Sequence, residues 1–169
     1  MKNYIEIKND GEIEIEALSL MGTSTKRDDK TKIGFFGTGN KYAIAVLLNK
    51  KIEFKIFSGE KEIKISTKPV LFRGTLFDKI FINGKPTSLT TSMGVDWENW
   101  FCVREIYCNA LDEGNASLKV TRNLKGEKGK TKFFIELTSD LEDVFKNINK
   151  YILFNKEEII TKKDTAFGK

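Results

Sequence analysis

Apolar and charged residues alternate along several short segments of the chain, as in Ile52-Glu53-Phe54-Lys55-Ile56. Such alternation puts the apolar side chains on one side of a strand, so it predicts a sheet with one buried face. Gly59-Glu60 and Asn83-Gly84 are turn signals between strands. The predicted strands are Tyr4–Lys8, Lys51–Phe57, Lys61–Thr67, Phe77–Asn83, Ser117–Arg122 and Lys132–Leu137.

Other segments carry the longer apolar repeat that is typical of helices. The segment from 96 to 113 is apolar around most of its circumference, which indicates a buried helix. We expect Asp96 to cap its start and Gly114 to follow its end. Strands and helices together predict an α+β two-layer sandwich, with a mainly antiparallel or mixed sheet and helices on one face. The predicted helices are Ile15–Met21, Asn40–Leu48, Asp96–Glu113 and Asp140–Leu153.

The polar stripe of the 96–113 helix is narrow and strongly acidic. Glu105, Asn109 and Asp112 stand four and then three residues apart, so they share one helix face. Hydrolysis of ATP on magnesium needs a carboxylate that accepts a proton from water and an oxygen that holds a hard cation. The alternative is that this stripe is the solvated edge of a core helix.

A glycine-rich segment, residues 32–48, runs directly into the helix predicted from residue 40. Gly34, Gly37 and Gly39 would let the backbone approach a ligand closely, and amides at the start of a helix suit a phosphate. Lys41 adds a positive charge in the first turn. Neither the P-loop nor the dinucleotide glycine pattern is present. The alternative is an ordinary glycine-rich turn.

Together these two segments resemble the GHKL ATPases, the family of gyrase B, the ninety-kilodalton heat-shock chaperone, histidine kinases and MutL. Glu105-x-x-x-Asn109-Ala110-x-Asp112 is similar to the family's N-box. Ile33-Gly34-x-x-Gly37-x-Gly39-x-Lys41-x-Ala43 is similar to its second glycine box, in the form found in MORC-type members. Residues 4–11 resemble the strand and first glycine box, and residues 17–26 resemble the helix and the start of the ATP lid.

The order of these motifs differs from that of familiar members, in which the N-box precedes both glycine boxes. Here the glycine boxes come first, so the resemblance implies a circularly permuted Bergerat-type fold. Permutation is physically tolerable because chain termini often lie close together and packing does not depend on chain order.

The resemblance implies an ATP-binding domain with magnesium-dependent ATPase activity. It assigns the general base to Glu105, a magnesium ligand to Asn109 and a place near the nucleotide to Asp112. Members of the family commonly dimerise when ATP binds, so an ATP-dependent homodimer is also implied. The remaining implied nucleotide-binding residues are Asn9, Asp10, Gly11, Ser24, Lys26, Gly34, Gly37, Thr38, Gly39 and Lys41.

The first glycine box departs from the family pattern. Where the family has an aspartate that accepts from the adenine amino group, this chain has Asn9, followed by Asp10. Asn9 is in phase with Ile5 and Ile7 on one strand face, and its amide can both accept and donate. Asp10 would need a local bulge to reach the same place. Asn-Asp-Gly is also an ordinary turn signal.

Composition suits one compact domain over residues 1–154, with a charged tail or the start of a further segment over 155–169. No histidine is present, which leaves Glu and Asp as the available general bases. Cys102 and Cys108, six residues apart on a buried helix, are predicted to be core residues and not a disulfide. No membrane span or signal peptide is apparent, so a cytoplasmic protein without a membrane partner is expected.

The stretch from Lys119 to Lys132 holds six basic residues and one acid, Glu127. Gly126 and Gly129 predict a flexible hairpin tip, which is either a solvated loop or a contact for nucleic acid. A net charge of +5 permits an alternative of a different class. That alternative is a small basic interaction or nucleic-acid-binding regulatory module, of which viral regulators are an example, without nucleotide chemistry.

Overall fold

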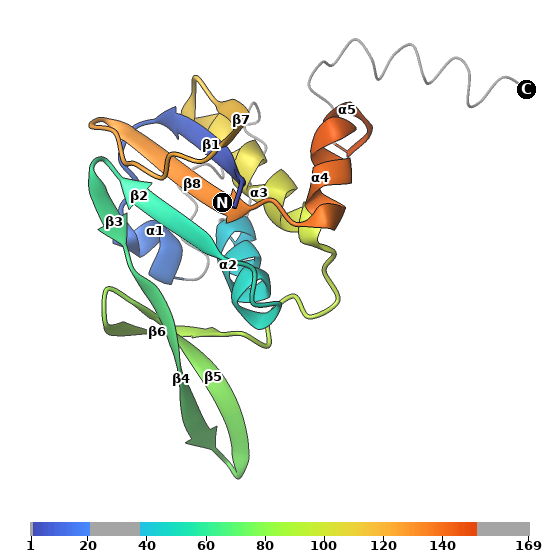
Figure 1. The fold of residues 1–169 in the computed structure, drawn as a ribbon. Coiled ribbons are helices and arrows are strands. Elements are labelled where there is room, and N and C mark those ends of the chain that lie inside the picture. Colours follow the sequence, from blue (N-terminus) through green and yellow to red (C-terminus); the bar gives the residue numbers. More distant parts are fainter. Residues whose placement is uncertain (1, 21–37, 152–169) are drawn as a thin grey trace, which may run out of the picture.

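The computed structural model describes residues 2–20 and 38–151, which form two antiparallel sheets and a layer of helices (Figure 1). The helices are α1 (Ile15–Ser19), α2 (Gly39–Asn49), α3 (Asn99–Glu113), α4 (Ser139–Lys146) and α5 (Ile148–Tyr151). The strands are β1 (Tyr4–Asp10), β2 (Phe54–Ser58), β3 (Lys61–Ile63), β4 (Ile65–Phe72), β5 (Thr75–Ile82), β6 (Lys85–Thr90), β7 (Ser117–Thr121) and β8 (Lys130–Glu136). Within these ranges no helix is both long and apolar enough to cross a membrane.

The larger sheet has five strands in the order β3-β2-β8-β1-β7. Strand β1 pairs antiparallel with β8 on one side and with β7 on the other. On its inner face Ile5 and Ile7 are fully buried, and Phe133 and Ile135 from β8 line the same core. Strand alternation therefore positions the core as predicted, and the α+β architecture with antiparallel strands is confirmed.

Helices α2 and α3 cover the inner face of this sheet. They lie antiparallel, because Gly39 at the start of α2 is beside Glu105 while Lys50 after its end donates to the Trp97 carbonyl before α3. Ala43, Ile44 and Leu47 of α2 and Cys102, Val103 and Ile106 of α3 are buried in the shared core. Both cysteines are free thiols, as predicted.

The outer face of the sheet is also partly covered, so the prediction of a single buried face was incomplete. Tyr4, Phe57 and Phe134 form a small second apolar cluster, on which Leu124 packs. Phe57 and Phe134 meet edge to face, with ring centroids 5.8 Å apart. These aromatic side chains are large and apolar, and the loop that connects β7 to β8 covers them.

That loop is the stretch that the sequence suggested as a flexible hairpin tip, and this prediction was wrong. Strands β7 and β8 are not neighbours, because β1 lies between them, so residues 122–129 cross over the sheet instead of turning a hairpin. The Glu127 amide donates to the Gly59 carbonyl at 2.9 Å, which ties the loop to the β2–β3 turn. Part of its basic charge is neutralised: Lys132 Nζ lies 2.8 Å from Glu127 Oε2, and Lys119 Nζ lies 3.2 Å from buried Glu6.

The second sheet, β4-β5-β6, was not anticipated. The predicted strand from 61 to 67 is divided at Lys64 between β3 and β4, which belong to different sheets, and β6 was missed. The Asn83–Gly84 turn was predicted correctly, and both residues have positive φ (47° and 78°), as a tight two-residue hairpin requires. Ile80, Ile82 and Leu89 anchor this sheet in the main core.

Two helix boundaries also differ from the prediction. Helix α3 begins at Asn99, not after Asp96, because the Trp97 amide donates to the Gly94 carbonyl in a preceding turn and the Trp97 ring stacks on Tyr42. Its end before Gly114 is confirmed, and Gly114 has a φ of 104°. The predicted helix from 140 to 153 is divided at Asn147 into α4 and α5, and residues 152 and 153 lie outside the described residues.

Candidate functional site

The start of α2 meets the middle of α3, so segments about 70 residues apart in sequence form one site. Asn109 Nδ2 donates to Asn40 Oδ1 at 3.1 Å across the two helices. A Cβ placed on Gly39 would overlap Glu105 Oε2 and would lie 3.3 Å from Glu105 Cβ. Gly39 is helical, so its lack of a side chain serves this close approach and not a positive φ. The structure thus brings together Gly39, Glu105 and Asn109, which the sequence singled out separately.

Asn109 is held by its amide nitrogen and keeps its amide oxygen available. The nitrogen donates to Asn40 Oδ1 and to the Glu105 carbonyl at 2.8 Å, whereas the oxygen accepts no hydrogen bond from the described residues. An amide oxygen is a ligand that Mg²⁺ accepts. The described residues contain no group of three or more His, Cys, Asp or Glu side chains that could hold a metal. A magnesium ion at Asn109 would therefore depend on phosphate oxygens and water for most of its ligands.

Glu105 is half-buried and oriented by its neighbour in sequence. Its Oε1 accepts from Arg104 Nη2 at 2.7 Å and from Arg104 Nε at 3.1 Å. The Arg104 guanidinium in turn lies over the rings of Phe101 (4.7 Å) and Trp100 (5.2 Å). Because adjacent residues on a helix do not normally face each other, sequence spacing did not single out Arg104. The forked guanidinium fixes one carboxylate oxygen and leaves Oε2 beside α2.

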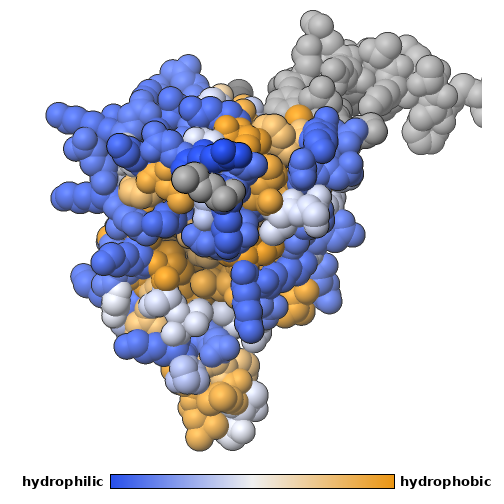
Figure 2. Space-filling model, in the orientation of Figure 1, coloured by the Kyte–Doolittle hydropathy of each residue, from blue (hydrophilic) through white to orange (hydrophobic). Residues whose placement is uncertain are grey.

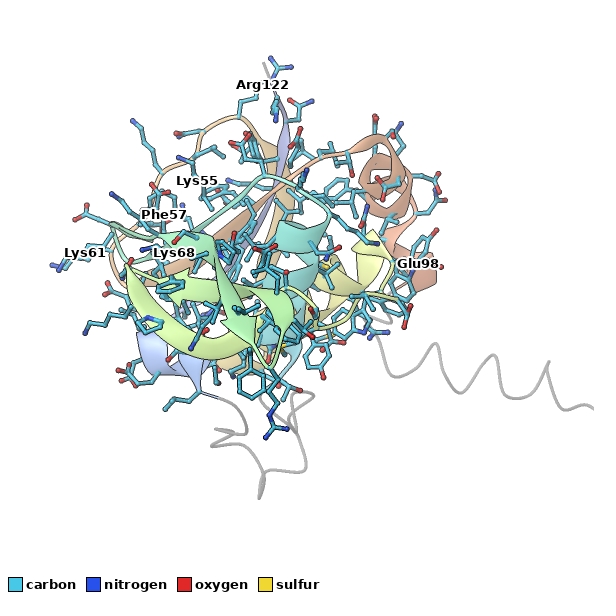
Figure 3. The ribbon with its side chains drawn as sticks, turned by 90° about the horizontal axis from the view of Figure 1, so that it is seen from below. Lys55, Phe57, Lys61, Lys68, Glu98 and Arg122 are labelled. Carbon is cyan, nitrogen blue, oxygen red and sulfur yellow. The ribbon has the colours of Figure 1, made fainter. Side chains whose placement is uncertain are left out.

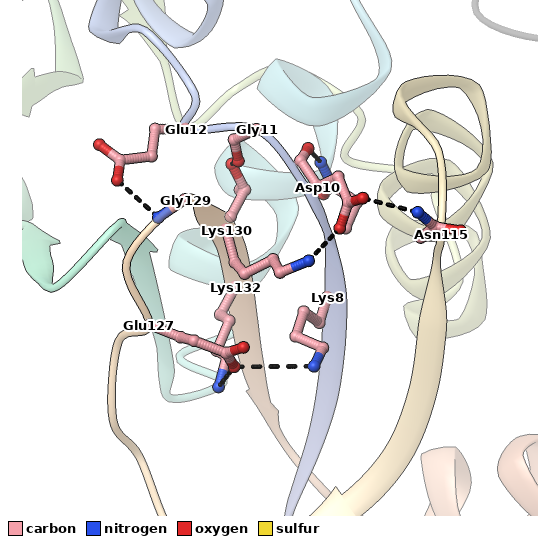
Figure 4. A network of polar contacts seen from close by, with 11 residues as sticks. Lys8, Asp10, Gly11, Glu12, Asn115, Glu127, Gly129, Lys130 and Lys132 are labelled. Atoms are coloured by element: carbon pink, nitrogen blue, oxygen red, sulfur yellow. Dashed lines mark hydrogen bonds and ion pairs between the residues drawn. The ribbon is translucent and has the colours of Figure 1, made fainter.

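Strand β1 brings Asn9, and not Asp10, to the inner face. Asn9 is buried on the side of the core, and its Nδ2 donates to the Asp10 carbonyl at 2.6 Å. Asp10 lies on the outer face (Figure 4), where its carboxylate pairs with Lys130 and accepts from Asn115 Nδ2 at 2.6 Å. The hydrogen bond from Lys130 holds the pKa of Asp10 below its ordinary value. The expectation that Asn9 is the residue in phase is confirmed, and Asp10 is not brought to the site.

Gly11 closes this end of β1. It has a φ of 80°, and its amide donates to the Gly129 carbonyl at 3.0 Å. The Thr131 hydroxyl, directly opposite Asn9 in the ladder, donates to the Gly11 carbonyl at 2.9 Å. Gly11 thus continues the hydrogen-bonded contact between β1 and β8 beyond the end of β1. Sequence reasoning had not selected Thr131, which only the strand register places there.

Asp112 and Lys41 are both buried. The end of α3 reaches the end of β1, because the Asp10 amide donates to the Gly114 carbonyl at 3.1 Å, and Asp112 lies in this last turn of α3. Lys41, in the first turn of α2, is only 1% exposed, and burial lowers its pKa. The ends of β1 and α3 and the start of α2 thus carry four of the predicted polar residues: Asn9, Lys41, Asn109 and Asp112.

The remaining predicted residues are only partly placed. Thr38 precedes α2 and makes no side-chain cap, although its carbonyl accepts from the amides of Lys41 and Tyr42. Ser24, Lys26, Gly34 and Gly37 lie outside the described residues.

Comparison of the chain with protein-family models, with curated proteins and with solved structures found no match.

Proposed function

We propose that the chain is an ATP-binding domain of the GHKL type that hydrolyses ATP with magnesium. The observation that carries the proposal is the meeting of Gly39 at the start of α2 with Glu105 and Asn109 on α3. A chance match of two short motifs would not require them to be neighbours in space. The end of α3 also contacts the end of β1, so the residues that resemble the first glycine box lie next to the helix that carries the N-box. A circularly permuted version of the fold requires this arrangement.

The start of α2 is suited to the phosphates. Helix α2 is 11 residues long, and its first-turn amides and dipole favour an anion. The absence of a side chain at Gly39 brings the backbone against Glu105. Asn109 offers its amide oxygen next to this point. A magnesium ion held there would neutralise part of the negative charge of the phosphates.

Glu105 is the proposed acceptor of the proton from the attacking water. Arg104 orients one carboxylate oxygen, which leaves Oε2 to act beside the start of α2. On the adenine side, Asn9 is buried on the inner face of β1, and its Oδ1 accepts no hydrogen bond from the described residues. That oxygen is therefore able to accept from an adenine amino group.

A titration with ATP tests the proposal. At one hundred times its dissociation constant, Mg-ATP should stabilise the parent chain by about 2.7 kcal/mol. Asn109→Ala should lose the magnesium-dependent part of binding, whereas Glu105→Gln should keep binding and lose hydrolysis by about 10²–10⁴-fold. Glu142→Gln, on α4, is the matched control because Glu142 is an exposed partner of Lys146, and it should behave like the parent.

Three results would each contradict a different part of the proposal. No binding of ATP by the folded parent would remove it altogether and favour the interaction module. Normal hydrolysis by Glu105→Gln would remove Glu105 as the base. Binding without turnover in the parent would leave a nucleotide-gated switch.

A further inference from the structure

The tip of the β4–β5 hairpin exposes an apolar surface that nothing in the described chain covers. It projects away from the two-layer body (Figure 1), and its tip is hydrophobic in the space-filling view (Figure 2). Val70, Leu71, Phe72 and Leu76 are 38%, 69%, 60% and 67% exposed. Such a cluster on a projecting ribbon differs from the scattered apolar residues of ordinary surfaces and indicates an interaction site.

The tip is apolar on both faces of the ribbon. Leu71 stands opposite Leu76, and Val70 stands opposite Phe77. Since successive residues of a strand point to opposite faces, these two pairs lie on different sides. A partner surface with one flat face would cover only one of them. A medium that surrounds the tip would cover both.

Three basic residues, which we call the basic collar, lie at the turn of the hairpin and just behind its apolar tip. Lys68 stands directly opposite Lys79, and Arg73 occupies the turn. Lys68, labelled in Figure 3, also lies 5.0 Å over the Phe81 ring. Like charges in directly opposite positions destabilise a hairpin unless an anion lies nearby. In the hairpin from 65 to 82, Asp78 is the one acidic residue.

We propose that this tip inserts into the surface of a lipid bilayer that carries anionic headgroups. From Val70 to Arg73 the strand advances by about 10 Å at ~3.3 Å per residue, which matches the ~5–10 Å depth of interfacial insertion. Lys68 and Lys79 then lie at the level of the headgroups. Arg73, stacked on Phe72 at 5.3 Å, reaches back to the phosphates with its long side chain. The insertion does not depend on nucleotide binding.

A second copy of the chain is the competing occupant. A cleft of about 670 Å³ lies at the base of the same hairpin and includes Leu48, Phe54 and Ile65 in its lining. Its lining also carries three lysines, Lys51, Lys55 and Lys64, and two carboxylates, Glu53 and Glu62. The lysines and carboxylates of the cleft nearly balance, so it offers little net negative charge to Lys68, Lys79 and Arg73 of an incoming tip. An anionic bilayer offers negative headgroups to all three. The charge pattern therefore favours the anionic bilayer.

The test is sedimentation of the full chain with vesicles of phosphatidylcholine alone and with vesicles that also contain phosphatidylglycerol. The parent should bind the anionic vesicles, and added salt should weaken binding. The double variant Leu71→Ser/Phe72→Ser should lose at least about tenfold in affinity, from the lost apolar burial. Lys68→Ser/Lys79→Ser should lose roughly fivefold per lysine. Val120→Ser is the matched control, because Val120 is exposed on β7, at an edge of the other sheet.

Circular dichroism and urea unfolding establish that each variant is folded, which exposed positions allow. Absence of parent binding to anionic vesicles would overturn the proposal. Equal binding by the tip variant and the control would do so as well. Light scattering identifies the competing occupant: a parent dimer that becomes a monomer in the tip variant, without vesicle binding, would assign the tip to a second copy.

Discussion

Substitution of Gly39 by alanine probes the contact between α2 and α3 without any ligand. In the interior of a helix this change stabilises by roughly 0.5–1 kcal/mol, because glycine loses more backbone entropy on folding, and this is the upper limit for Gly39, the first residue of α2. At this position the new methyl group would overlap Glu105 Oε2 and lie 3.3 Å from Glu105 Cβ and Cδ. The carboxylate must then rotate away, and it would lose its bonds from Arg104.

The two effects are of similar size. A pair of hydrogen bonds to a half-exposed carboxylate contributes on the order of 0.5–1 kcal/mol after solvent screening. Gly39→Ala alone should therefore leave the free energy of unfolding within about 0.5 kcal/mol of the parent. In the Glu105→Ala background the overlap with Oε2 is absent and only the 3.3 Å approach of the two Cβ atoms remains, so the same change should be more favourable than in the parent, by up to about 0.5–1 kcal/mol. The difference between the two backgrounds is the coupling energy of the contact.

Urea unfolding of the parent, the two single variants and the double variant measures this coupling. The midpoints are compared at constant m-value, so that changes in compactness are not mistaken for stability. An equal effect of Gly39→Ala in both backgrounds would refute the contact between Gly39 and Glu105. The proposed site would then lose the observation that carries it. Ile106→Val, one residue further on α3 and buried in the core, is a suitable background in which no coupling to Gly39 is expected.

Two other predictions concern stability. Phe134→Ala should lower the free energy of unfolding, measured in urea, by about 3–5 kcal/mol, because Phe134 is fully buried on the outer face of the sheet. Phe72→Ala on the exposed hairpin tip is the control and should change this free energy by less than about 0.5 kcal/mol. Equal losses in the two variants would contradict the second apolar cluster. The pKa of Asp10 is lowered in the folded protein, chiefly by Lys130, so its contribution is present above the unfolded pKa of about 4 and is lost as the pH falls below it. Asp10→Asn should therefore flatten the loss of stability in acid, and an unchanged pH profile between pH 5 and pH 2 would exclude this ion pair.

The local periodicity of the sequence determined most elements. Alternation along Tyr4–Lys8 identified β1 and its inner face, which is why Asn9 and not Asp10 was expected toward the core. Gly114 marked the end of α3, and Asn83-Gly84 marked a hairpin turn. These features depend on the residue itself and its near neighbours, so they can be read along the chain.

Only the tertiary structure decided which elements are neighbours. Alternation specifies which face of a strand is buried but not which strand lies beside it, so β1 between β8 and β7 was not predictable. The same holds for the loop from 122 to 129 across the outer face and for the division of the chain at Lys64 between two sheets.

The candidate site divides in the same way. The spacing of Glu105 and Asn109 placed them on one helix face, because the helical repeat is local. Their meeting with Gly39 and Asn40 required the packing of α3 against α2, which depends on burial summed over the whole core. The orientation of Glu105 by Arg104 follows from the position of the guanidinium over Trp100 and Phe101, a tertiary arrangement that no spacing rule specifies.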